Sequence, residues 1–402
     1  MTTASTLATI SPAEDIDYVE RARRLGPVIE AGVAEAERTS QIAPNVMDAL
    51  REACLLRLLL PRALGGGALD PDKFAVVIEV IAAADASTAW TVNQTSVCSA
   101  GAAFMTPFAA KELYGPAEGM LAWGAGAKAR AQETGGGYRI TGTWQFASGS
   151  RHATHIGGHC GVFDAAGAPC LGDNGKQIER TMLFPRAHVK FDNVWRVMGL
   201  KGTGSDTYTV TDLFVPEAMS CPTITDWIAT TPSDPAPIYR FSGSALYAGG
   251  FGAIALGNAR GMLDTFIHIA RDKTPRGAKN ALRDSPVVQM QVALADTQLR
   301  AARTFLIQSL REVQEGIRAT GAITTDQRMT IRAAGTNAIH RGTEVVETLY
   351  RAAGATAIFE TEPFERRFRD AYSVSQHLQG RLAHFEQIGK HLLGQETDLM
   401  FV

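Results

Sequence analysis

The sequence predicts a mainly α-helical protein with one β domain, in the order helical domain (residues 1–120), β domain (121–235) and helical bundle (236–402). Three observations support this prediction. The length of 402 residues exceeds what one hydrophobic core usually supports, so two or three packed units are expected. The spacing of apolar residues is helical at first and changes to a β-type pattern between about residues 123 and 216. It becomes helical again after about residue 244.

The first segment shows apolar residues at helical spacing from about residue 17 to residue 105, for example at Val46, Leu50 and Cys54. This pattern is interrupted where Leu60-Pro61 is followed by three glycines at 65–67. Proline lacks an amide donor and glycine has a flexible backbone, so the stretch ends a helix and starts a turn. It is interpreted as a boundary between helices and not as a phosphate-binding loop.

The middle segment contains short runs of β-branched and aromatic residues bounded by glycine turns, at 138–141 and 207–211. These runs predict a small antiparallel β unit. A connection containing Pro232, Pro235 and Pro237 leads to long helical patterns from about residue 244 to residue 393. No Rossmann-type glycine fingerprint follows a predicted strand, so a nicotinamide-binding domain is not expected.

Charge and apolar pattern argue against nucleic-acid and membrane partners. The formal net charge is -2, and the chain has no long block of lysine or arginine. The opening stretch from Met1 to Ser5 lacks the basic region and apolar run of a secretory signal. No later stretch is long and apolar enough to span a bilayer. A cytoplasmic protein is therefore expected.

The cysteines and histidines suggest neither disulfides nor a metal centre. The five cysteines are odd in number and scattered, without a Cys-x-x-Cys spacing, so free thiols are expected; they are Cys54, Cys98, Cys160, Cys170 and Cys221. His152, His155 and His159 have a spacing that could place metal ligands on one helix face. However, Gly157-Gly158 disfavours a helix and no carboxylate lies among the three histidines, so we predict no metal.

Four stretches in the same order resemble the acyl-CoA dehydrogenase superfamily and together span most of the chain. The first three are residues 60–67, residues 137–149 (GYRITGTWQFASG) and residues 198–207 (MGLKGTGSDT). In the fourth, residues 369–394, Arg369-Asp370-Ala371 is followed by His377 and by GKHLLG at the end. The position that matches the family's catalytic glutamate holds Leu378, which cannot take a proton, whereas the neighbouring His377 titrates near neutral pH. This combination resembles the flavin-dependent two-component monooxygenases (group D) of the superfamily.

The resemblance implies a fold with an N-terminal helical domain, a middle β-barrel-like domain and a C-terminal four-helix bundle. It further implies that Ser148 hydrogen-bonds near flavin N5 and that His377 performs acid-base work, which makes these two the expected catalytic residues. The expected cofactor-binding residues are Trp123, Phe146, Ser148, Gly202, Thr203 and Ser205. Phe146 is expected to pack against the isoalloxazine ring.

One departure from the family pattern concerns the helix after residues 86–90. Several members carry a further histidine there, whereas this chain has Asn93, Gln94 and Cys98. By resemblance of position, the substrate-binding wall is expected to comprise Trp90, Asn93, Tyr247 and Phe251. His384 and His391 lie seven and fourteen residues after His377, so on one continuous helix they would drift slowly from its face. His384 is therefore a candidate second contributor.

The function implied by the resemblance is the oxygenase component of a two-component system. Reduced FMN or FAD from a separate flavin reductase would react with O2 to a C4a-hydroperoxide, which oxygenates a small, aromatic or heterocyclic substrate. A homotetramer is also implied. Two alternatives stay open at this point: an acyl-CoA dehydrogenase or related flavin oxidase, which would require a carboxylate base that Leu378 does not supply, and a non-catalytic binding protein on the same fold. Tightly bound yellow flavin in the purified protein would favour the dehydrogenase, and failure to bind reduced flavin would favour the binding protein.

Overall fold

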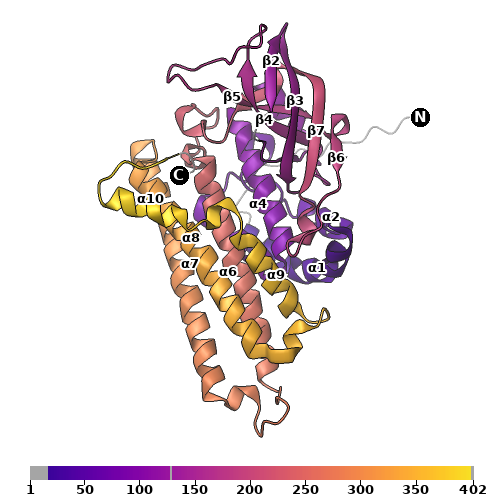
Figure 1. Ribbon diagram of the computed structural model, residues 1–402, viewed down its shortest axis with the longest axis vertical. Helices are drawn as coiled ribbons and strands as arrows, with labels where there is room; N and C mark the ends of the chain where they lie inside the picture. The colour runs from indigo at the N-terminus through magenta and orange to yellow at the C-terminus, as the bar shows by residue number, and fades with distance from the viewer. Residues whose placement is uncertain (1–16, 127–128, 400–402) are drawn as a thin grey trace, which may run out of the picture.

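The computed structural model describes residues 17–126 and 129–399, so the stretch from Met1 to Ser5 discussed above lies outside it. Figure 1 shows a β-sheet at one end of the molecule, short N-terminal helices beside it and long C-terminal helices extending away from it. Among the described residues, no helix combines the length and the apolar character needed to cross a membrane.

The N-terminal helices are α1 (Tyr18–Thr39), α2 (Pro44–Glu52), α3 (Pro71–Ala84), α4 (Ala86–Ala100) and α5 (Pro107–Tyr114). The predicted turn follows α2, and at Gly66 a Cβ atom would lie 2.0 Å from the Leu60 carbonyl oxygen, which explains the glycine. Helix α4 begins where the Asp85 carboxylate accepts a hydrogen bond from the Thr88 amide at 2.7 Å. Every residue of α4 is buried, because α3, α6 and β1 pack around it.

The sheet contains β1 (Leu121–Trp123), β2 (Arg130–Thr134), β3 (Gly137–Ala147), β4 (His155–Phe163), β5 (Glu179–Pro185), β6 (Lys190–Asp192), β7 (Asp206–Pro216) and β8 (Ser220–Pro222). Its order is β6-β7-β3-β2-β4-β5-β8, with β1 paired to β4. Most strand pairs are antiparallel, as predicted, but β4 runs parallel to both β1 and β2, so the sheet is mixed. After the β2–β3 hairpin the chain crosses back, which gives β4 the direction of β2.

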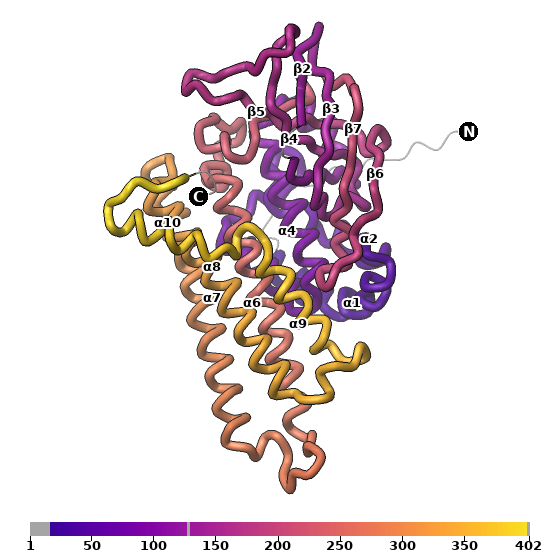
Figure 2. The backbone as a smooth tube through the Cα atoms, in the orientation of Figure 1, coloured from indigo at the N-terminus to yellow at the C-terminus, as the bar shows by residue number. Residues whose placement is uncertain are grey.

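The C-terminal helices are α6 (Gly243–Ala270), α7 (Pro286–Thr320), α8 (Thr325–Ala353), α9 (Pro363–Ser375) and α10 (Ala383–Leu392). Helix α6 is buried between α3 and α8. Glycines permit a close approach to α8, since a Cβ at Gly335 would lie 2.6 Å from the Ala248 carbonyl oxygen. The tube in Figure 2 shows the last helix, α10, turned away from the axes of α7 and α8.

Candidate active site

Ser148 lies directly after β3, at a distortion of the sheet. The pairing of β3 with β7 shifts register between Trp144 and Ala147, which is a β-bulge. Phe146, within this bulge, has a positive φ of 60°, and the residue is 61% exposed beside Trp195. Bulges redirect the side chains that follow them. Here the exposed aromatic ring precedes a serine that is buried.

A chain of buried hydroxyl groups begins at Ser148. The Trp90 indole Nε1 donates to Ser148 Oγ at 3.0 Å. Ser148 Oγ lies 2.7 Å from Ser205 Oγ, which lies 2.7 Å from Thr203 Oγ1. Thr203 Oγ1 donates to the Leu200 carbonyl oxygen at 2.8 Å. Three predicted site residues, Ser148, Thr203 and Ser205, therefore belong to one hydrogen-bonded chain that ends on Trp90.

The loop that carries Thr203 and Ser205 is fixed from two sides. Leu200, with φ of 54°, donates its backbone N–H to Asp370 Oδ1 on α9 at 2.7 Å. At the other end, Arg151 makes two hydrogen bonds to the Asp206 carboxylate, at 2.8 and 3.1 Å. Gly202, a predicted cofactor-binding residue, packs against α4, where a Cβ would lie 2.9 Å from Ser87 Cβ.

His377 does not lie on a continuous helix with His384 and His391, so the shared helix face expected from their spacing does not form. Helix α9 ends at Ser375, and the His377 side chain caps a short 3-10 turn by accepting from the Gln379 amide at Nδ1, 3.3 Å away. His384 Nε2 instead contacts the Leu378 carbonyl oxygen at 2.7 Å. His391 lies 2.6 Å from Asp326 Oδ1, so both are occupied by neighbouring structure.

The environment of His377 keeps its imidazole neutral. Burial, together with the positive charges of Arg332 and Arg381, lowers the pKa of His377 to about 3. Protonation at Nδ1 would also remove the hydrogen bond from Gln379. The ring therefore carries its proton on Nε2, for which no described residue is a hydrogen-bond partner.

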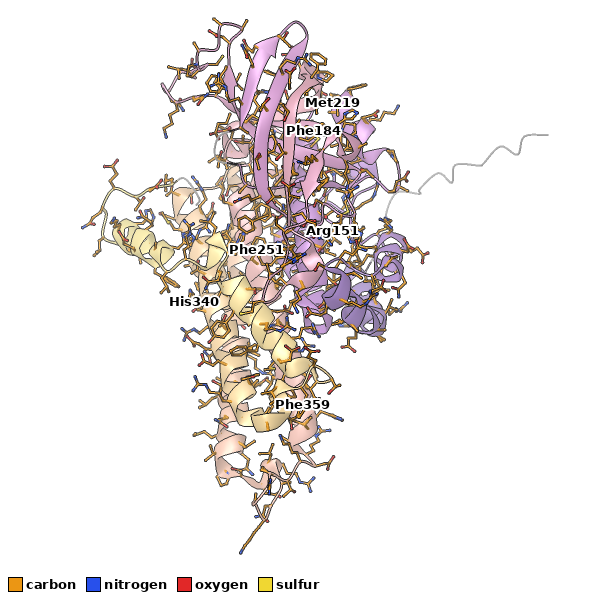
Figure 3. The ribbon with its side chains drawn as sticks, turned by 45° about the vertical axis from the view of Figure 1, so that its right-hand side comes forward. Arg151, Phe184, Met219, Phe251, His340 and Phe359 are labelled. Atoms are coloured by element: carbon orange, nitrogen blue, oxygen red, sulfur yellow. The ribbon has the colours of Figure 1, made fainter. Side chains whose placement is uncertain are left out.

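Aromatic side chains from α4 and α6 surround His377. Its ring centroid lies 4.1 Å from that of Phe251 and 5.2 Å from that of Trp90, which meets it edge-on. Tyr247 stacks on Phe251 at 5.5 Å and accepts a hydrogen bond from Trp123 Nε1 at 3.1 Å. Figure 3 places Phe251 near the junction of the sheet and the long helices. Trp90 thus links the apolar pocket of His377 to Ser148.

Asn93 lies one turn after Trp90 on α4 and is fully buried. Both polar atoms of its amide lack a hydrogen-bond partner in the part of the chain that the structure describes. Its Oδ1 points at α6, where a Cβ on Gly250 would lie only 1.8 Å away. An unpaired buried amide is costly, so this group is a candidate to bind a polar atom of a ligand.

The carboxylates near His377 in sequence do not replace the missing base. Glu365 pairs with Arg369 at 2.5 Å on α9, and Glu386 pairs with Lys390 at 2.6 Å on α10. Leu378 occupies the matching position itself. A carboxylate base is what removal of an α-proton from a thioester requires. The described structure around His377 does not supply one.

The other histidines considered as metal ligands lie on or before β4 and not on a helix. His159 Nδ1 lies 2.8 Å from Thr181 Oγ1, and His155 Nδ1 lies 3.2 Å from Thr154 Oγ1. Within residues 17–126 and 129–399, no group of histidine, cysteine, aspartate and glutamate side chains is arranged to hold a metal ion. All five cysteines are free.

Sequence reasoning missed three parts of this site: the Trp90–Ser148 hydrogen bond, the contact of Asp370 with Leu200, and the Gln379 amide that fixes the His377 tautomer. Asp370 carried the clearest signal, because it belongs to the Arg369-Asp370-Ala371 motif. The motif indicates that these three residues belong to the site. It does not indicate which distant residues they contact, because those contacts depend on how the helices and the sheet pack.

Comparisons with known proteins identify the family of the chain. The N-terminal domain family of acyl-CoA dehydrogenases matches residues 20–114, and the C-terminal domain family matches residues 249–381. An indole-3-acetate monooxygenase of Pseudomonas putida is 29% identical over 86% of each chain. The oxygenase subunit HsaA, a flavin-dependent monooxygenase of Rhodococcus jostii, is 27% identical over 89% of this chain and 93% of its own length.

A solved structure described as 3-HSA hydroxylase from Rhodococcus sp. RHA1 superposes with a TM-score of 0.87 at 25% identity, covering 96% of this chain and 99% of that one. The likeness therefore extends over the helices, the sheet and the bundle together. The chain belongs to the acyl-CoA dehydrogenase superfamily, and within it is similar to the flavin-dependent monooxygenases.

Proposed function

We propose that this protein is the oxygenase component of a two-component flavin-dependent monooxygenase, which takes reduced FMN or FAD from a separate flavin reductase. With O2 it oxygenates a small aromatic or heterocyclic substrate. One observation carries the proposal: a neutral histidine in an aromatic pocket is joined through Trp90 to a buried serine, where a dehydrogenase of this superfamily would need a carboxylate. The names of the relatives support the same reaction class.

The residues around Ser148 fit a flavin. Ser148 offers a polar contact at the end of β3, and the exposed ring of Phe146 offers an apolar surface next to it. Thr203 and Ser205 support Ser148 through hydrogen bonds, Gly202 packs against α4, and Trp123 donates from Nε1 to the Tyr247 hydroxyl. When bound, reduced flavin supplies the electrons that activate oxygen. The protein holds and shields it.

His377 acts in this proposal as a hydrogen-bond donor through Nε2–H. With its pKa at about 3, the imidazolium is scarcely populated at neutral pH, so the ring is not a reservoir of protons. A neutral N–H in an apolar pocket still stabilises negative charge that develops on oxygen. The rings of Trp90 and Phe251 exclude water from the same space.

The substrate wall combines flat aromatic surface with one polar group. Trp90, Phe251 and Tyr247 pack on one another, and this aromatic cluster suits contact with a planar ring. Asn93 offers an unpaired donor and an unpaired acceptor. This arrangement suits a small aromatic or heterocyclic molecule with a hydroxyl, amide or ring N–H substituent, oriented by Asn93.

The direct test is anaerobic titration with reduced FMN and reduced FAD, followed by exposure to oxygen and by spectra. We expect binding of at least one reduced flavin, no oxidation of NADH or NADPH by the chain alone, and activity when a flavin reductase is added. Direct, stoichiometric consumption of NADH by the pure protein would contradict the two-component assignment. Failure to bind either reduced flavin would favour a non-catalytic role.

We propose further that the chain assembles as a homotetramer through its long C-terminal helices. Helix α7 exposes apolar side chains at Val287, Met290, Leu294 and Phe305, each at least 42% exposed. Such a stripe on a long helix suits burial against a second copy of this chain. Light scattering after size exclusion should report a tetramer, and Leu294→Glu should weaken it. A monomer at micromolar concentration would contradict the assembly.

We also propose domain boundaries at about residues 120 and 235, because α5 ends at Tyr114, β1 begins at Leu121 and α6 begins at Gly243. Limited proteolysis should cut first near these boundaries if they separate folding units. A cytoplasmic location is proposed as well, since the five cysteines are unpaired.

A further inference from the structure

The hydroxyl chain from Ser148 to Leu200 has a definite proton direction. A carbonyl oxygen only accepts, so the single hydroxyl proton of Thr203 points at the Leu200 carbonyl, 2.8 Å away. The contact between Thr203 and Ser205, at 2.7 Å, then needs its proton from Ser205. By the same reasoning, the 2.7 Å contact between Ser205 and Ser148 takes its proton from Ser148.

This direction determines what Ser148 can still do. Its own proton is committed to Ser205, and one of its two lone pairs accepts the Trp90 indole N–H at 3.0 Å. One lone pair remains, so Ser148 can accept a further hydrogen bond but cannot donate one. All four side chains are at least nine-tenths buried, so water does not readily substitute for a missing partner.

We propose that the Thr203–Ser205 pair makes Ser148 an acceptor only, and that this selects reduced over oxidised flavin at the site. The inference rests on the proposed function, which places the flavin next to Ser148. Position N5 of a reduced flavin carries a proton and is a donor, whereas N5 of an oxidised flavin is an acceptor. Reduced flavin therefore gains a hydrogen bond from the free lone pair of Ser148. With oxidised flavin, the lone pair of N5 would face the lone pair of Ser148 Oγ, so no hydrogen bond forms.

Such selection serves a protein that must capture reduced flavin from a reductase and release the oxidised form after turnover. Thr203 acts here as a positioning residue, because it reaches N5 only through Ser205 and Ser148. The anchor of the chain is the peptide of Leu200, whose N–H is held by Asp370 at 2.7 Å. The direction is thus set by backbone that the bundle fixes in place.

The test measures the dissociation constants of oxidised and anaerobically reduced flavin for the wild-type protein, Thr203→Val and Thr203→Ser. Valine keeps the shape and removes the hydroxyl, so Ser205 turns its proton toward Ser148 and frees the Ser148 proton for oxidised N5. We expect Thr203→Val to lower the preference for reduced flavin roughly two- to tenfold, the value of one neutral hydrogen bond, mainly through tighter binding of oxidised flavin. Thr203→Ser retains the hydroxyl and should retain the preference.

A second readout is the midpoint potential of the bound flavin. A tenfold change in the ratio of the dissociation constants of oxidised and reduced flavin corresponds to about 30 mV for a two-electron couple. The potential should fall in Thr203→Val and stay unchanged in Thr203→Ser. Ser205→Ala frees the Ser148 proton by a different route, and should shift the ratio the same way if the valine variant does not fold.

The outcomes separate this inference from the function on which it rests. Wild-type protein that binds both redox states equally, or Thr203→Val and Ser205→Ala variants that keep the wild-type ratio, would overturn the selection mechanism and leave the monooxygenase assignment intact. Wild-type protein that binds neither flavin in either state would overturn both.

Discussion

Replacement of His377 by glutamine and by alanine separates hydrogen bonding from proton transfer. Burial and two neighbouring arginines lower the pKa of His377 to about 3, so its ring is neutral at pH 6, whereas a solvent-exposed histidine would be mostly charged there. His377 is therefore not available as a charged general acid at neutral pH. It is available as a neutral hydrogen-bond donor through Nε2–H.

The expected magnitudes follow from this difference. A hydrogen bond to a developing negative charge contributes about 1.5–3 kcal/mol, so His377→Ala should lower product formation per flavin oxidised by roughly 10- to 100-fold, with oxygen diverted to hydrogen peroxide. Loss of a full acid-base catalyst would cost up to about 10⁴-fold. His377→Gln carries an amide N–H near the position of Nε2 and should retain most of the coupling.

The assay supplies reduced flavin from a reductase and measures product and peroxide in parallel between pH 5.5 and 8.5. In the wild-type protein, the yield of product per flavin oxidised should not change around pH 6.5 in a way that depends on His377. The pH profiles of the wild-type protein and His377→Gln should therefore have the same shape. If such a change exists, imidazolium does the work and the neutral-donor assignment is wrong. If His377→Ala retains wild-type coupling, the histidine is structural.

Four further predictions test other parts of the structure. Ser148→Ala should raise the peroxide fraction by a smaller factor, roughly two- to tenfold, because one neutral hydrogen bond is lost; unchanged coupling would remove Ser148 from the site. Gly250→Ala places a Cβ 1.8 Å from Asn93 Oδ1 and should destabilise the fold by about 1–3 kcal/mol in denaturant titrations, whereas Gly249→Ala, whose nearest contact is a leucine methyl group at 3.2 Å, should cost clearly less; equal losses would contradict the packing argument. The folded-state pKa of His377 lies below its unfolded value of 6.5, so its contribution to stability is present above pH 6.5 and is lost as the pH falls toward 3. The unfolding free energy of His377→Gln should therefore decline less steeply between pH 7 and 5 than that of the wild-type protein, by up to about 1.4 kcal/mol per pH unit. Parallel curves for the two proteins would refute the lowered pKa. Acyl-CoA thioesters should not bleach an artificial electron acceptor in the presence of the protein, and turnover at ordinary enzyme rates would restore the dehydrogenase reading.

The fold was predictable from sequence because its signals are local and repeated. Helical apolar spacing, the β-branched runs and the stop at Leu60-Pro61 each depend on neighbouring residues, and the structure has helices, sheet and helices in that order. The parallel pairing of β4 was not predictable in this way, since strand direction depends on a crossover and not on composition. The end of α9 before His377 was missed because a side chain, and not a proline or glycine, caps the turn.

The sequence predicted that certain residues of the candidate site lie together, but not the contacts between them. Motif resemblance pointed to Ser148, His377, Trp90 and Phe251, and the structure brings these four together. Their chemistry depends on contacts between residues far apart in the chain. The neutral state of His377 follows from burial and from the Gln379 amide, and neither is encoded in the spacing of the motif.

The origin of these residues explains why the site needs the whole fold. Ser148 follows the sheet, Trp90 lies on α4, and His377 follows α9, so their geometry exists only when sheet and bundle are packed together. A buried ion pair holds two of these elements: Asp85, which caps α4, contacts Arg366 of α9 at 2.9 Å. Buried ion pairs contribute little net stability because desolvation offsets their attraction. The role of this ion pair is better explained as positioning, because it holds α4, which carries Trp90, against α9, which leads to His377.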